Sequence, residues 1–113
     1  MIFEHNKKEK MKVDEFLEIV RKYQNNIETT KHTFFRLNEK QRKIYDDVKL
    51  RGYLLNKRPL EVWKQENAHL AAFYPLDLDK DKILKIILNV NFNKIYIVTF
   101  YILNIRQRQE LGK

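Results

Sequence analysis

The chain has 113 residues, which is the size of one ordinary domain and too short for two. It contains no cysteine, which excludes disulfides and thiolate metal ligands or nucleophiles and fits a reducing, cytoplasmic compartment. The net charge is +8, from 23 Lys and Arg against 15 Asp and Glu, and this balance favours either an acidic partner or simply high solubility.

No export signal or membrane segment is expected. The first eight residues carry charges without an uninterrupted apolar stretch behind them, unlike a signal peptide. The most apolar segment, from Ile95 to Ile105, is well short of the roughly 20 residues that a membrane-spanning helix needs. This segment is therefore predicted to be a buried strand.

The first half of the chain, residues 12–58, is predicted to be helical. From Val13 to Tyr23, apolar residues recur at helical spacing with charged residues between them, and this pattern predicts a first helix. A second helix would begin near Thr30, and a third, short helix would be ended or bent by Gly52. The apolar residues that indicate these two later helices are Phe34, Phe35, Leu37, Ile44, Tyr45 and Val48.

Residues 59–103 are predicted to form four antiparallel strands in two hairpins. Alternation of apolar and polar residues predicts a first hairpin over 60–74, and β-branched and aromatic residues predict a second over 83–102. Helices followed by strands predict a single α+β domain, with two or three helices on a four-stranded antiparallel sheet and a polar tail over 104–113. The shared core is expected to include Phe34, Leu37, Val98 and Phe100.

The positive charge is concentrated in one part of the chain. Residues 1–30 are neutral, whereas residues 31–58 hold nine basic side chains against three acidic ones, and residues 59–113 hold eight against six. A local excess of +6 is typical of a binding site for a polyanion such as nucleic acid. The alternative is a solvated helical surface.

No cofactor or metal is expected. The sequence has no nucleotide-binding loop and no hydrolase or zinc-protease motif. Asp77, Asp79 and Asp81 begin like a calcium loop, but the glycine at its turn and the distal glutamate are missing. The three histidines form no spaced pair of ligands.

Basic and aromatic residues are the candidates for chemistry on RNA. A metal-free ribonuclease needs a base, an acid and a cation beside the scissile phosphate. His32 and Arg36, four residues apart, would form a cationic stripe on one helix face, unless His32 packs at the helix edge and Arg36 pairs with an acidic neighbour. The candidate proton-transfer residues are His32, His69 and Tyr101. The candidate phosphate-binding residues are Arg36, Lys40, Arg42, Lys43, Arg51, Lys64, Arg106 and Arg108.

The pattern Lys31-His32-x-x-x-Arg36-Leu37, followed by a short helix and two hairpins ending near Tyr101, resembles small proteins of the RelE/ParE toxin superfamily. The likeness covers about residues 30–103 and is greatest to members with a His-x-x-x-Arg motif on the second helix. It implies helices on a four-stranded antiparallel sheet, RNA or ribosome-bound mRNA as the target, and an antitoxin as a further partner. Active RNA-cleaving members concentrate Lys and Arg on their central strands, where this chain has only Lys85.

Three functions therefore fit the sequence. The leading hypothesis is a toxin-like, RNA-directed protein that acts as a metal-independent mRNA endonuclease. The alternatives are a non-catalytic nucleic-acid-binding protein and a protein-interaction module whose charge serves solubility. Only cleavage separates the first two, since both would bind less tightly as salt rises.

Replacing Arg36, Lys40, Arg42 and Lys43 together by Gln tests whether residues 31–58 hold a polyanion site. We expect weaker binding to single-stranded RNA or to DNA and a shallower dependence of log K on log salt, because fewer counterions are released. Filter binding over a range of salt concentrations measures both quantities. Unchanged affinity would rule out a polyanion site in this segment.

Overall fold

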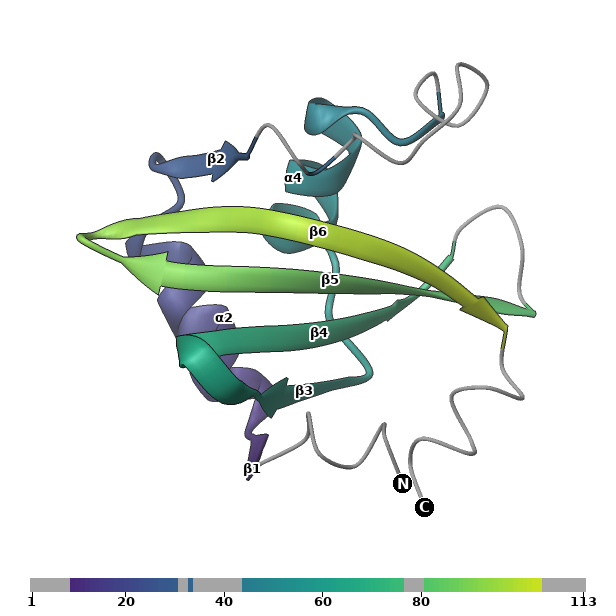
Figure 1. The fold of residues 1–113 in the computed structure, drawn as a ribbon, viewed down its shortest axis with the longest axis horizontal. Helices are drawn as coiled ribbons and strands as arrows, with labels where there is room; N and C mark the ends of the chain where they lie inside the picture. The colour runs from purple at the N-terminus through teal and green to yellow at the C-terminus, as the bar shows by residue number, and fades with distance from the viewer. Residues whose placement is uncertain (1–8, 31–32, 34–43, 77–80, 105–113) are drawn as a thin grey trace.

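A computed structural model of the protein describes residues 9–30, 33, 44–76 and 81–104. The chain forms six strands, two α-helices and one 3₁₀ turn in these parts (Figure 1). In chain order they are β1 (Glu9–Met11), α2 (Val13–Lys22), β2 (Ile27–Thr29), α4 (Asp47–Asn56), β3 (Glu61–Lys64), the 3₁₀ turn η1 (Glu66–Ala68), β4 (His69–Pro75), β5 (Lys82–Asn91) and β6 (Lys94–Asn104).

The strands form one mixed sheet in the order β1-β3-β4-β5-β6-β2. Four neighbouring pairs are antiparallel, and β2 runs parallel to β6. The two predicted hairpins are present as β3–β4 and β5–β6. The predicted fold class, two or three helices on a four-stranded antiparallel sheet, is wrong, because the sheet is six-stranded and mixed and the described residues form only two short helices.

The two unpredicted strands lie at the sheet edges. Each has three residues, too few for an alternating pattern to stand out from a helical one. β2 lies just before the predicted start of the second helix. After β2, the Thr33 amide donates a hydrogen bond to the Thr30 carbonyl and closes a turn. The remainder of that predicted helix, residues 34–43, is outside the described residues.

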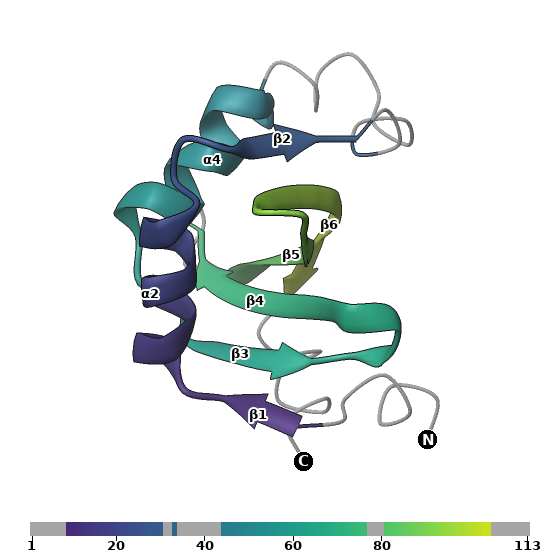
Figure 2. The same cartoon turned by 90° about the vertical axis from the view of Figure 1, so that its left-hand side faces the viewer.

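Both helices cover the same face of the sheet (Figure 2). α2 leads from β1 at one edge of the sheet to β2 at the other, and α4 leads back towards β3. α2 has Asp14 and Glu15 in its first turn and Arg21 and Lys22 in its last, so its charges complement the helix dipole. The side chains of Phe16 and Val20 are buried against the sheet.

The start and end of α4 are fixed by local interactions. The Asp46 carboxylate accepts a hydrogen bond from the Lys49 amide at 2.8 Å and caps the first turn. The helix continues through Gly52, which was predicted to end or bend it, as far as Asn56, and Pro59 lies just beyond. Neither described helix is long and apolar enough to cross a membrane.

The sheet has a separate cluster of buried side chains on each face. The larger cluster lies under the helices and includes Phe16, Leu50, Leu54, Tyr74, Leu84, Ile86, Leu88, Ile95, Ile97 and Phe100. The smaller cluster, on the other face, contains Ala71, Phe73, Ile83 and Ile87, with Trp63, Val98 and Leu103 packed against it. Phe100 is therefore in the core shared with the helices, as predicted, whereas Val98 lies on the opposite face.

A β-bulge accounts for the position of Val98. The pairing of β5 with β6 shifts between Ile87 and Leu88, and Val98 is the extra residue on β6. At the same place, Thr33 Oγ1 donates a hydrogen bond of 2.7 Å to the carbonyl of Ile97. Thr30 Oγ1 donates one of 3.3 Å to the carbonyl of Val98. Threonine hydroxyls thus supply donors to β6 where β2 ends.

Phe100→Ala tests the assignment of the two faces. Phe100 is 5% exposed and its ring packs against Tyr45, with the centroids 5.6 Å apart. We expect the free energy of unfolding to fall by roughly 3–5 kcal/mol, because a large buried side chain is lost. The neighbouring Tyr101→Ala is the control, since Tyr101 lies on the other face and is 38% exposed. A larger loss for Tyr101→Ala than for Phe100→Ala in denaturant titrations would show that the faces are reversed.

Tyr74 predicts a loss of stability at alkaline pH. Its side chain is fully buried under the helices, its hydroxyl has no hydrogen-bond partner among the described residues, and burial raises its pKa well above the usual value. Above pH about 10 the unfolded chain therefore loses this proton first, and the free energy of unfolding should fall by about 1.4 kcal/mol per pH unit. Tyr74→Phe should remove this component and leave stability at neutral pH unchanged or higher. Denaturant titrations from pH about 8 to about 11 give the free energy of unfolding of both proteins. If the two free energies fell in parallel with pH, the expectation would be contradicted.

Candidate interaction surface

The structure does not bring the described candidate residues together. His69 begins β4 and Tyr101 lies on β6, and the pairing of β4, β5 and β6 places both on the sheet face opposite the helices. Lys64 lies on the helix-covered face, because its partner in the sheet is Leu70, a member of the larger core. Its ammonium group is 3.6 Å from the Glu9 carboxylate.

His69 and Tyr101 are also far apart on their shared face. His69 is opposite Asn89 on β5, and Tyr101 is opposite Lys85, four residues away on that strand. With about 3.3 Å per residue along a strand and about 4.8 Å between strands, the two residues are about 16 Å apart. A single phosphate cannot contact both.

Tyr101 has a cationic neighbour of its own. The Lys85 ammonium group lies 5.8 Å from the centroid of the Tyr101 ring and 5.6 Å from that of Phe73. Lys85 thus lies among aromatic rings on the sheet face opposite the helices. Phe73 itself is 1% exposed, so its ring is not open to stacking by a nucleic-acid base.

The other candidates are Arg51, which lies on α4, and residues outside the described parts of the chain. The latter are His32, Arg36, Lys40, Arg42, Lys43, Arg106 and Arg108. Arg51 forms an ion pair with Asp47 one helical turn away, and its Nε atom is buried without a hydrogen-bond partner among the described residues. It lines a hollow on the helical side of the molecule.

The outer side of α4 is unusually apolar for a surface helix. Its inner side buries Leu50, Tyr53 and Leu54. On its outer side, however, Val48 is 70% exposed and Leu55 is 45% exposed. A solvated helix normally has polar residues opposite its buried stripe, and a helix that is apolar all round normally has a second neighbour. Exposed apolar groups gathered in this way are typical of interaction sites.

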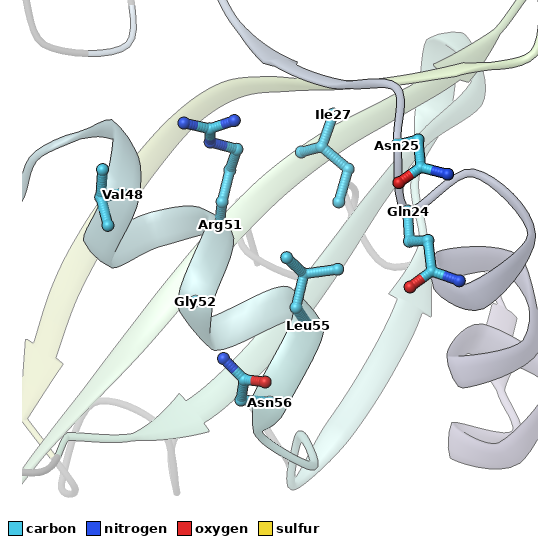
Figure 3. A pocket seen from close by; sticks show the side chains of 8 residues that line it. All are labelled: Gln24, Asn25, Ile27, Val48, Arg51, Gly52, Leu55 and Asn56. Carbon is cyan, nitrogen blue, oxygen red and sulfur yellow. The ribbon is translucent and has the colours of Figure 1, made fainter.

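Gly52 lies between Val48 and Leu55 on the same side of α4. A methyl group added to it would meet no described atom within 4 Å, so the space above it is open. This space is part of a hollow of about 260 Å³ (Figure 3). In Figure 3, α4 lies on one side of the hollow, and Gln24, Asn25 and Ile27, from the connection between α2 and β2 and from β2 itself, lie on the other.

Two further hollows adjoin this one. A hollow of about 260 Å³ shares Val48, Gly52 and Asn56 with it and extends to Lys49 and Lys57. A hollow of about 250 Å³ shares Gln24 and Leu55 with it and extends between α4 and α2. We call this continuous surface, formed by the residues that line the three hollows, the α4 face. Its lining residues are Leu17, Val20, Arg21, Gln24, Asn25, Ile27, Val48, Lys49, Arg51, Gly52, Tyr53, Leu54, Leu55, Asn56 and Lys57.

The described residues that line the α4 face are mainly apolar, amide and cationic. The described residues that line it include no histidine and no carboxylate. In the described parts of the whole chain, no three His, Asp or Glu side chains are grouped closely enough to hold a metal ion. Sequence reasoning singled out Arg51 but missed the face itself. The available signal was the spacing of Val48, Gly52 and Leu55, which puts apolar and small residues opposite the buried side of α4.

The comparisons identify a family without describing an activity. A family model, that of the MJ0788 family, matches residues 14–98, and the chain belongs to this family. The matched region includes both helices and extends to the bulge on β6. No curated protein and no solved structure matches the chain. The resemblance to RelE/ParE toxins remains a prediction, since the family match does not refer to it.

Proposed function

We propose that this member of the MJ0788 family is a non-enzymatic binding module that docks a protein partner on its α4 face. The observation that carries the proposal is the exposed side of α4, where Val48 and Leu55 lie on either side of the open space above Gly52. Burying these two side chains against a partner would remove apolar surface from water, which is the main driving force of protein association.

The size of the hollows favours a macromolecular partner over a small molecule. Each measures about 250–260 Å³, below the roughly 300–1,000 Å³ of typical small-molecule sites. Adjoining shallow hollows fit the side chains of a partner that crosses α4. Gly52 supports this reading, because glycine within a helix costs roughly 0.5–1 kcal/mol relative to alanine and is favoured where another backbone comes close.

An endonuclease centre receives less support. Two of its three candidate proton-transfer residues, His69 and Tyr101, are about 16 Å apart by their sheet positions and cannot act together on one phosphate. The third, His32, lies outside the described residues. Nucleic-acid binding without cleavage is the second candidate. The concentration of nine basic residues in 31–58 favours it, and four of them, Lys49, Arg51, Lys57 and Arg58, lie in the described residues at or just after α4.

Site-specific photo-crosslinking in the cells that make the protein tests the proposal. A photoreactive amino acid at position 55 should give discrete adducts with a protein, and the adducts should resist nuclease. The matched control is position 60, because Leu60 is 50% exposed, as Leu55 is 45% exposed, but does not line the α4 face.

A second substitution links the adducts to the α4 face. Gly52→Leu places a side chain in the open space without a clash at Cβ and should abolish the adducts from position 55. Circular dichroism and the thermal midpoint verify that this variant is folded. The proposal would be overturned if positions 55 and 60 gave the same adducts, or if position 55 gave none. Adducts that are sensitive to nuclease would favour nucleic-acid binding instead.

A further inference from the structure

The charges on the α4 face are all of one sign. Four cationic side chains line its hollows, and none of the described lining residues is Asp or Glu. Arg21 and Arg51 lie on the side towards α2 and β2, and Lys49 and Lys57 lie on the other side of the helix. An apolar centre with cations on both sides is complementary to a partner that has an apolar centre flanked by acidic groups.

The four cations lie at the surface, either partly or largely exposed. Arg51 engages Asp47 through one terminal nitrogen, and its side chain is 41% exposed. Arg21 and Lys57 are both exposed residues. Arginine and lysine bind carboxylates through charge-assisted hydrogen bonds, which are stronger than neutral ones.

The shape of the α4 face favours a helix as the partner element. Val48, Gly52 and Leu55 follow one another at intervals of four and three residues, so they form a ridge interrupted by a gap. Side chains of a second helix can enter the hollows beside such a ridge, and the gap at glycine lets the two backbones approach closely. Apolar residues at the same spacing on the partner would complete the contact.

A second copy of this chain is a poor occupant. Self-docking would place Arg21, Arg51, Lys49 and Lys57 of each copy against the cations of the other, in a protein whose net charge is already +8. Juxtaposed like charges oppose association. An acidic partner replaces this repulsion by attraction.

We infer that the α4 face binds an acidic amphipathic helix of another protein, with its apolar residues over Gly52 and its carboxylates beside Arg21, Arg51, Lys49 and Lys57. This inference rests on the proposed function and adds the chemistry of the partner. Attraction between exposed charges makes the binding weaken as salt rises.

Selection from a random peptide library tests the inference. The library displays peptides of about 15 residues, enough for about four helical turns. The full chain is the target, and binders that also recognise Gly52→Leu are removed. The remaining peptides should carry apolar residues at positions i, i+3 or i+4 and i+7 and an excess of Asp and Glu. Binding of the enriched peptides, followed by fluorescence anisotropy, should weaken at least tenfold in Gly52→Leu.

A charge reversal is the second arm. Arg21→Glu with Lys57→Glu removes one cation from each side of the face. This double variant should bind the acidic peptides at least tenfold more weakly. Lys10→Glu with Lys12→Glu is the matched control, since both lysines are exposed, do not line the face and give the same change in net charge. Equal effects of the two pairs of substitutions would show that the attraction depends only on the net charge of the protein. That result would overturn the inference.

The remaining outcomes separate the inference from the proposed function. Peptides that depend on Gly52 but lack acidic residues or helical spacing would overturn the inference and leave protein docking on α4 intact. A dimer in analytical ultracentrifugation that Gly52→Leu dissociates would assign the face to a second copy. Displacement of the peptides by single-stranded RNA with the same dependence on Gly52 would assign it to nucleic acid. If no selected peptide depends on Gly52 and position 55 gives no crosslinks, both proposals fail.

Discussion

The helical side of this molecule depends on the parallel pairing of β2 with β6. This pairing is reinforced by Glu28 of β2, whose carboxylate accepts a 3.2 Å hydrogen bond from the Lys94 ammonium group and thereby raises the pKa of Lys94. Because β2 is at the opposite edge of the sheet from β1, α2 must cross the sheet to reach it. The connection that follows α2 then brings Gln24, Asn25 and Ile27 opposite α4, where they form one wall of the central hollow (Figure 3). The crossover therefore supplies the residues that face α4 across this hollow.

Local patterns in the sequence predict the hairpins but not the edges of the sheet. The runs that form β5 and β6 are long and rich in β-branched residues, so their pairing needs only the turn between them. β2 pairs with a strand far along the chain, and its three residues carry no period that reveals this partner. The bulge at Val98 is equally hidden, since strict alternation would place Val98 and Phe100 on one face.

The candidate surface could be predicted only in part. Gly52 suggested an interruption of the helix, because glycine is a poor helix former, whereas the packing of Leu50 and Leu54 on the sheet carries the helix through it. The apolar residues on the other side of α4 then have no place in the core. The separation of His69 from Tyr101 could not be predicted, since it depends on strand register and not on residue type.

The dimensions of the α4 face set the kind of binding that it can support. A ten-residue helix is about 15 Å long, so a partner helix that crosses it contacts fewer residues than the roughly 20–30 per side of a standard interface. Small interfaces are typical of transient complexes, whose affinity depends on a few well-packed side chains. For such a complex, the cations contribute mainly to the rate of association and to the choice of partner, because exposed charges steer an acidic ligand but add little once it is bound. The apolar ridge at Val48 and Leu55 would then govern how long the partner stays, since dissociation re-exposes these side chains to water.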